Sequence, residues 1–158
     1  MADFFLKPGR KPLKTILIIA GVVLALALGY FVIYKNYTAA GIYQKGKAYY
    51  DNEQYDEAIQ LFRKAAEQGY AKAQEVLGDC YYCGVGVPED KTQGIAWYRK
   101  AAEQGNAEAQ YSLGLCYYYG NGVPQSKSEA LYWYRKSAAQ GYSASEYWVR
   151  ELESKGVR

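Results

Sequence analysis

Two hydrophobic patterns divide the chain near residue 38. Residues 16–33 form an apolar run without a charged residue, whereas the later part of the chain mixes apolar and polar positions. After residue 39, apolar residues recur at helical spacing in short segments that end at glycines, as Ile95, Tyr98, Ala101 and Ala102 do before Gly105. This spacing predicts amphipathic helices. The sequence therefore predicts one apolar helix followed by an all-α domain.

The all-α part contains a repeated unit. Residues 73–88 and 109–124 both read Ala-Gln-x-x-Leu-Gly-x-Cys-Tyr-Tyr-x-Gly-x-Gly-Val-Pro, and residues 97–105 and 133–141 close the two units with a shared Trp-Tyr-Arg-Lys start. Equivalent residues lie 36 positions apart, as in Ala73 and Ala109. Self-similarity at a fixed period of this size is the mark of a stacked repeat array.

Each unit is predicted to be a helix hairpin. The first helix ends at Gly84, and Gly86 with Pro88 prevents the helix from resuming at once. The second helix is expected to begin near Asp90, or near Ser126 in the next unit. Gly78 and Gly114 interrupt the first helices, where glycine costs roughly 0.5–1 kcal/mol. We attribute both glycines to close approach by the second helix.

A shorter copy lies upstream, between Gly46 and Gly69, with a first turn four residues shorter. Its glycine, tyrosine, alanine and phenylalanine spacing resembles a tetratricopeptide repeat, and the two longer copies resemble Sel1-like repeats. The resemblance implies an all-α solenoid of helix hairpins. We divide it into a tetratricopeptide-like repeat at 39–70, Sel1-like repeats at 71–106 and 107–142, and a capping helix with a tail at 143–158.

The apolar run predicts a transmembrane helix over residues 15–34, because 20 residues at ~1.5 Å per residue span the ~30 Å hydrocarbon core. A cleaved signal peptide is the alternative, although its apolar region is normally shorter. Residues 1–14 are a basic tail and residues 35–38 a linker. Lys7, Arg10, Lys11 and Lys14 precede the span, which places the N-terminus in the cytoplasm and the repeats across the membrane, in the periplasm of a Gram-negative host.

Within the predicted span, Gly21, Ala25 and Gly29 fall on one helix face. Small residues at this spacing allow two membrane helices to pair, so a homodimer through this segment is possible. The alternative is that glycine and alanine are simply common in membrane helices.

Composition restricts the chemistry. The chain has no histidine, which excludes Ser-His and Cys-His nucleophilic pairs and histidine metal sites. From Lys35 onward it carries 15 basic and 15 acidic residues, so nothing indicates nucleic-acid binding. Cys80 and Cys83 have the spacing of a redox or zinc motif, but Cys80 recurs as Cys116, as a packing residue would. We expect no catalytic residue, metal or cofactor, and no enzyme.

The remaining signal is the 19 tyrosines. The resemblance implies that the first helix of each hairpin lines the inner face of the array. The residues this places there, called the inner-face residues below, are Tyr43, Lys47 and Tyr50; Glu75, Asp79 and Tyr82; Tyr111, Leu115, Tyr118 and Tyr119; and Tyr147 on the cap.

A tyrosine-rich face of this kind is typical of protein-binding surfaces. The sequence therefore predicts a membrane-anchored scaffold that binds a protein or peptide. Two alternatives stay open at this point: a self-association module that forms a homo-oligomer, and an accessory subunit of an envelope enzyme. Some of these tyrosines could instead pack between hairpins. The resemblance also places Tyr81, Tyr117 and Phe62 at contacts within hairpins, so we expect Tyr81 and Tyr117 to face the interior of their own hairpins.

Overall fold

The structure is a computed structural model that describes residues 22–24, 26 and 38–158. The chain divides into two units, 1–36 and 37–158. Residues 22–24 and 26 are helical. Among the described residues, no helix has both the length and the apolar character needed to cross a bilayer. The predicted span at 15–34, with Gly21, Ala25 and Gly29, otherwise lies outside the described residues.

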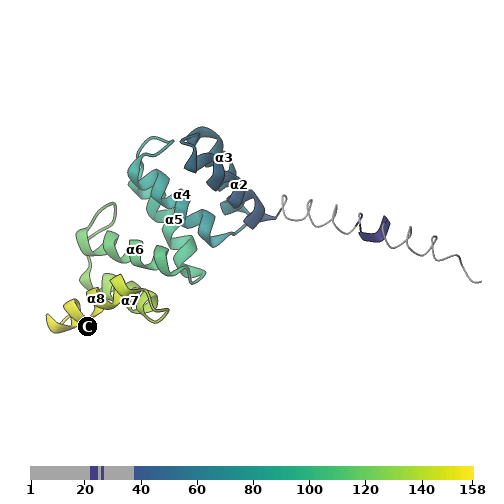
Figure 1. Cartoon of the computed structure of the whole chain (residues 1–158). Helices are drawn as coiled ribbons and strands as arrows, with labels where there is room; N and C mark the ends of the chain where they lie inside the picture. The colour runs from purple at the N-terminus through teal and green to yellow at the C-terminus, as the bar shows by residue number, and fades with distance from the viewer. Residues whose placement is uncertain (1–21, 25, 27–37) are drawn as a thin grey trace, which may run out of the picture. The chain divides into compact units, whose positions relative to one another are not determined.

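The second unit is all-α within the part of the chain that the structure describes. Its helices follow one another in a single array, from the first hairpin to the C-terminus (Figure 1). In order they are α2 (Ala39–Asp51), α3 (Tyr55–Glu67), α4 (Ala71–Cys83), α5 (Lys91–Glu103), α6 (Ala107–Tyr119), α7 (Lys127–Ala138) and α8 (Ser143–Ser154). Each helix packs mainly on its neighbours in sequence. This nearest-neighbour packing is that of a helical solenoid.

The predicted helix ends are confirmed. Gly84 closes α4 with a left-handed φ of 71°, and Gly120 closes α6 in the same way. At the start of α5 the Asp90 side chain accepts a hydrogen bond from the backbone N–H of Gln93, and Ser126 does the same at the start of α7. Both contacts satisfy amide groups that a helix start leaves without an intrahelical partner.

The two glycines inside the first helices mark close contacts within hairpins, as the sequence predicts. A Cβ placed on Gly78 would lie 2.6 Å from a ring carbon of Tyr98, and one on Gly114 would lie 2.5 Å from the ring of Tyr134. Both distances are too short for a real side chain. The glycine in each first helix therefore makes room for the aromatic ring of its own second helix.

Contacts between hairpins follow the same 36-residue period. Arg63 on α3 donates to the hydroxyl of Tyr81 at 2.6 Å, and Arg99 on α5 donates to the hydroxyl of Tyr117 at 2.8 Å. We expected Tyr81 and Tyr117 to face the interior of their own hairpins. The expectation is wrong in this detail, because each tyrosine is bonded to the preceding hairpin. At the last junction Arg135 binds the carboxylate of Glu153 instead.

A second set of polar contacts, made by glutamine side chains, also joins successive hairpins. The Gln74 side chain donates to the backbone carbonyl of Ala66, and Gln104 donates to Gln74. Gln110 and Gln140 repeat the arrangement one unit later. The buried amides are thus hydrogen-bonded, as polar groups in a core must be. Their regular spacing holds successive hairpins in one register.

The capping helix α8 packs against α7 through a different contact. The buried Ser145 hydroxyl bonds the hydroxyl of Ser137 at 2.8 Å, at positions where the earlier junction has Ala109 and Ala101. Leu152 of α8 is fully buried in a cluster with Ala130, Leu131 and Tyr134 of α7. The other face of α8 carries the exposed Tyr147 and charged side chains. This distribution agrees with the polar cap expected from the sequence.

Candidate functional site

The inner-face residues gather in two places. The first is a cavity of about 210 Å³ between α2 and α4, called the α2–α4 pocket below. Four inner-face residues line it, and four further residues that the sequence did not single out complete it. The predicted residues are Tyr43, Lys47, Tyr50 and Asp79, and the others are Asp51, Phe62, Val76 and Cys80.

The walls of this pocket are aromatic. The ring of Tyr43 lies 5.6 Å from that of Phe62, and the ring of Tyr50 lies 6.0 Å from Phe62, centroid to centroid. Tyr43 is only 8% exposed, so it lines the pocket with little of its surface open to solvent, and its contact with a partner stays a prediction. Burial raises the pKa of both tyrosine hydroxyls above the usual value. These hydroxyls therefore stay neutral and act as hydrogen-bonding groups.

Charged groups of both signs lie at the pocket. Lys47 pairs with Asp51 one helical turn later, with 3.5 Å between the ammonium nitrogen and the carboxylate oxygen. Asp79 accepts a hydrogen bond from the hydroxyl of Tyr98 at 2.5 Å. Glu75, one turn before Asp79 on α4, is 8% exposed.

The carboxyl group of Glu75 has unusual electrostatics for an inner-face residue. Burial raises its pKa to about 8, and the negative charges of Asp79 and Glu108 act in the same direction. Glu75 is consequently protonated at neutral pH and hydrogen-bonded to Asp79. Glu75 is therefore a buried, neutral group rather than an exposed acid, and its part in partner binding stays a prediction.

The second gathering is aromatic, on α6 and α8, and is called the α6–α8 aromatic cluster below. Tyr118 stands at its centre, with ring centroids 4.9 Å from Tyr119 and 4.7 Å from Trp148. Tyr147 also contacts Trp148, whereas Tyr111 turns toward Tyr142. The cluster joins Tyr118, Tyr119 and Tyr147 from the inner-face set with Trp148, and Tyr111 and Leu115 pack against the core beneath it.

Exposure differs sharply within this cluster. Tyr119 is 57% exposed and Tyr147 is 60% exposed, while Tyr118 is half-buried. Among the aromatic inner-face residues, Tyr119 and Tyr147 are therefore the most open to solvent. Tyr82 lies between the two gatherings, half-buried against Tyr98 and 5.8 Å from the ammonium group of Lys91.

Sequence reasoning missed Trp148 and Phe62. Trp148 lies on the capping helix, outside the repeated pattern, so no periodic signal pointed to it. Phe62 was assigned to contacts within its hairpin. Its ring is part of the core and also lies 6.0 Å from the ring of Tyr50, so one ring belongs to both the core and the pocket wall.

The cysteines belong to the packing of the array. Cys80 and Cys116 are buried, and burial raises the pKa of their thiols to about 12 and about 11. Both thiols are therefore unreactive at neutral pH. Cys83 is exposed and free. In the part of the chain that the structure describes, no group of three or more potential ligands could hold a metal ion.

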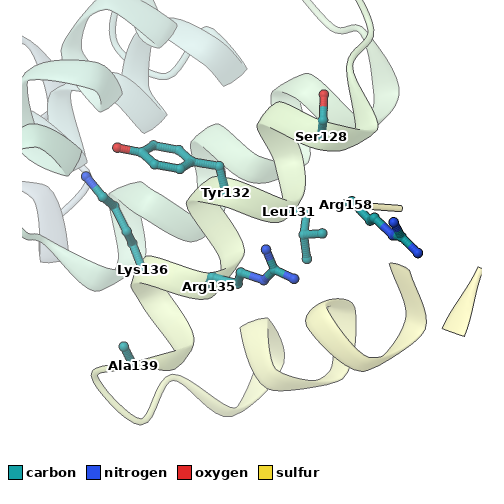
Figure 2. A pocket seen from close by; sticks show the side chains of 7 residues that line it. All are labelled: Ser128, Leu131, Tyr132, Arg135, Lys136, Ala139 and Arg158. Atoms are coloured by element: carbon teal, nitrogen blue, oxygen red, sulfur yellow. The ribbon is translucent and has the colours of Figure 1, made fainter. Parts of the chain in front are cut away.

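A larger cavity, of about 490 Å³, lies on the opposite helix layer, over α7 (Figure 2). Figure 2 shows Tyr132 and Lys136 along one side, with Arg135 and Leu131 toward the C-terminal segment and Arg158 at the far end. Ser128 and Ala139 complete its lining.

This cavity repeats a feature of the preceding hairpin. A cavity of about 370 Å³ over α5 is lined by Ile95 and Arg99, the equivalents of Leu131 and Arg135, and by Gly122 of the next hairpin's turn. A Cβ on Gly122 would lie 2.7 Å from Ile95, so the turn fits closely onto α5. The cavity over α7 is thus equivalent to the surface of α5 on which the turn of the next hairpin packs.

Comparison with known proteins identifies the repeat. The Sel1 repeat model matches residues 37–70, 71–106 and 107–142, and it includes the short first copy that resembles a tetratricopeptide repeat. No curated protein sequence matches the chain significantly.

Three solved structures illustrate the likeness. A protective antigen of uropathogenic Escherichia coli with an SLR fold, c5321, is 36% identical, with a TM-score of 0.72 over 75% of this chain and 26% of its own. A Sel1 repeat protein of Oxalobacter formigenes is 34% identical, with a TM-score of 0.69 over 73% of this chain and 46% of its own. Cysteine rich protein B of Helicobacter pylori is 26% identical, with a TM-score of 0.55 over 56% and 67% of the two chains.

The chain therefore spans about a quarter and about half of the first two relatives. Sel1 repeat proteins generally mediate interactions between proteins and are typically not catalytic. The matched repeats cover most of the chain, and both the helix order and the hairpin packing agree with them. The chain belongs to the Sel1 repeat family.

Proposed function

We propose that this protein is a membrane-anchored scaffold that binds a protein or peptide along the inner face of its Sel1 array. The observation that supports the proposal most directly is the α2–α4 pocket, where Tyr43, Lys47, Tyr50 and Asp79 from two successive hairpins line one cavity. Its aromatic walls with a few polar groups are the composition of a recognition pocket.

The α6–α8 aromatic cluster extends this surface toward the C-terminus. Tyr119 and Tyr147 expose large amphipathic rings, which bury much area at low entropic cost when a partner binds. An extended chain lying along the inner face would contact first the α2–α4 pocket and then this cluster. Two contact areas on one face suit a peptide or a protein segment better than a small molecule.

Site-specific photo-crosslinking in membranes tests this proposal. A benzoylphenylalanine side chain would replace Tyr119 on the inner face, Tyr50 at the pocket, or Tyr132 on the outer side of α7. Tyr132 is the matched control, because it is an exposed tyrosine at 49%. We expect crosslinked partners, identified by mass spectrometry, from Tyr119 and Tyr50 and not from Tyr132. Equal or stronger crosslinking from Tyr132 would place the binding surface on the outer helices and contradict the proposal.

We further propose that residues 15–34 anchor the array, with the N-terminus in the cytoplasm. The support is the uncharged run at 16–33 and the four basic residues before it. A reporter that is active only outside the cytoplasm, fused after Arg158, should be active. Neutralising the four basic residues should reduce or invert that activity. A wild-type fusion that is active only with a cytoplasmic reporter would overturn this orientation.

A further inference from the structure

The cavity over α7 and the cavity over α5 are lined by equivalent positions of the repeat. Each of the 7 residues that line the α7 cavity lies 36 positions after a residue that lines the α5 cavity. Gly122 and Val123, in the turn of the next hairpin, form part of the α5 cavity. The turn of the second hairpin packs on α3 in the same way, since a Cβ on Gly86 would lie 2.7 Å from Tyr55. The second helix of a hairpin is thus the surface on which the turn of a following hairpin packs.

The α7 cavity differs from its equivalent in charge. Ala139 stands where the α5 cavity has Glu103, and Arg158 stands where it has Gly122. The other two basic residues of the lining are present in both cavities. The α5 cavity is therefore lined by two basic residues and one acid, whereas the α7 cavity is lined by three basic residues and no acid (Figure 2).

Two of these three positive charges have no carboxylate partner. Arg135 binds Glu153, with 2.6 Å between Nη2 and Oε1. Lys136 and Arg158 form no ion pair within the part of the chain that the structure describes. The Lys136 ammonium group lies 4.7 Å from the centre of the Tyr132 ring, and this contact positions it at the cavity. The α7 cavity is therefore an open surface with two positive charges that the array itself does not pair.

The turn of the first hairpin has the opposite charge. Residues 51–54 connect α2 to α3 and are exposed, and they include Asp51 and Glu53, with Asp56 following in the first turn of α3. Asp51 is paired with Lys47. Glu53 and Asp56 form no ion pair with any lysine or arginine among the described residues. No hairpin precedes α2 in the described part of the chain, so this acidic turn has no second helix on which to pack.

We propose that the acidic turn of the first hairpin in one copy of this protein docks in the α7 cavity of a second copy. The unpaired acids of the turn, Glu53 and Asp56, then meet the two unpaired cations of the cavity. The opposite charges give the contact a direction, because two acidic turns or two basic cavities repel each other. Since the two surfaces differ, the contact is heterologous and can add further copies end to end. The inner face takes no part in this contact, so the inference goes beyond the proposed function.

Light scattering during size-exclusion chromatography of the full chain in neutral detergent measures this association. We expect the protein mass to rise with concentration at about 50 mM salt. It should return to the mass of one copy at about 0.5 M salt, where charges are screened beyond about 4 Å. Exposed ion pairs are individually weak, so the association should need a high protein concentration.

Charge reversal at either end tests the two surfaces. The cavity variant, Lys136→Glu with Arg158→Glu, should weaken the association at least about tenfold, because attraction becomes repulsion at two contacts. The turn variant, Glu53→Lys with Asp56→Lys, should weaken it to a similar extent. All four side chains are exposed, so both variants should fold, and thermal melting checks this. Lys100→Glu is the matched control, since Lys100 is the equivalent of Lys136 in the α5 cavity, and it should leave the association unchanged.

A protein that carries the cavity and the turn reversals together completes the test. Its two ends are again of opposite charge, so it should associate like the wild type although each reversal alone does not. An equimolar mixture of the cavity variant and the turn variant should associate as well. Recovery of this kind depends on the pairing of the two ends and would not follow from a change in folding.

Several results would overturn this contact. They are a single copy at every concentration and salt condition, unchanged association after either reversal, or no association of the combined protein. A dimer that neither salt nor reversal alters would also overturn it, because such a dimer pairs through another part of the chain. The proposed function is tested separately, since photo-crosslinks from the inner face to other proteins can fail while end-to-end association remains. A crosslink from Tyr132 to a second copy of this chain reports the present contact and not a partner of the inner face.

Discussion

Two equivalent tyrosines, Tyr98 and Tyr134, should respond in opposite ways to loss of the hydroxyl group. Each packs its ring against the glycine of the preceding helix, Gly78 or Gly114. The Tyr98 hydroxyl donates to Asp79, whereas the Tyr134 hydroxyl is buried and has no hydrogen-bond partner in the described part of the chain. The cause lies one residue after each glycine, where the second hairpin has Asp79 and the third has Leu115.

The magnitudes follow from the surroundings of each hydroxyl. A hydrogen bond to a charged group contributes about 1.5–3 kcal/mol, and Asp79 is exposed enough to regain water, so Tyr98→Phe should cost about 1–2 kcal/mol. A buried hydroxyl without a partner is unfavourable by about 1–3 kcal/mol, so Tyr134→Phe should be neutral or stabilise by about 1 kcal/mol. The first hairpin already has phenylalanine, Phe62, at this position.

Chemical unfolding of the full chain in detergent, followed by far-ultraviolet circular dichroism, measures both changes on the same scale. We expect the two variants to differ by about 2–3 kcal/mol, which corresponds to roughly 10 °C in melting temperature for a domain of this size. If Tyr134→Phe destabilises as much as Tyr98→Phe, the Tyr134 hydroxyl has an acceptor such as a buried water, and the reasoning is refuted.

Four further predictions concern stability. Because the pKa of Glu75 is raised in the folded state from 4.5 to about 8, its contribution is present at low pH and is lost as the pH rises through that window. Glu75→Gln should flatten this decline, which is on the order of 2 kcal/mol or more in urea unfolding across pH, and equal slopes would contradict the assignment. Gly114→Leu should destabilise by about 1–3 kcal/mol or more through a clash with the facing tyrosine, and a wild-type melting temperature would disprove the close contact. Gly122→Leu should also destabilise, because leucine is strained at a φ of 73° and because its side chain would clash with Ile95. Tyr81→Ala should lower the free energy of unfolding by roughly 3–5 kcal/mol in thermal melts. Arg63→Ala should cause only the part of this loss that comes from the hydrogen bond to Tyr81.

Local features of the sequence were enough for the helices and for their pairing into hairpins. Gly84 and Asp90 end and start helices through their own backbone and side-chain preferences, which depend on few neighbours. Gly78 could be assigned to a close contact because only a nearby group explains a glycine that recurs within a helix. The 36-residue period then predicted a solenoid and its family.

The inner face was only partly predictable. Periodicity places Tyr43, Glu75 and Tyr111 at the same position of the first helix in three successive hairpins, but it does not give their exposure. Exposure depends on the neighbouring hairpin, and here the Tyr43 and Glu75 side chains are covered while Tyr119 is open. The irregular residues of the cap, Trp148 among them, had no repeat partner from which to infer a role.

The sequence by itself determined the repeat, the helix boundaries and the glycines that let each hairpin close, because these depend on residues near one another in the chain. Only the tertiary structure decided which hairpin each repeated side chain contacts. Tyr81 bonds Arg63 of the preceding unit, Glu75 is buried beside Asp79, and the Tyr134 hydroxyl has no hydrogen-bond partner among the described residues. The physical reason is that the rotation between successive hairpins sets these distances, and small changes of side chain at equivalent positions give each junction its own hydrogen bonds and charges.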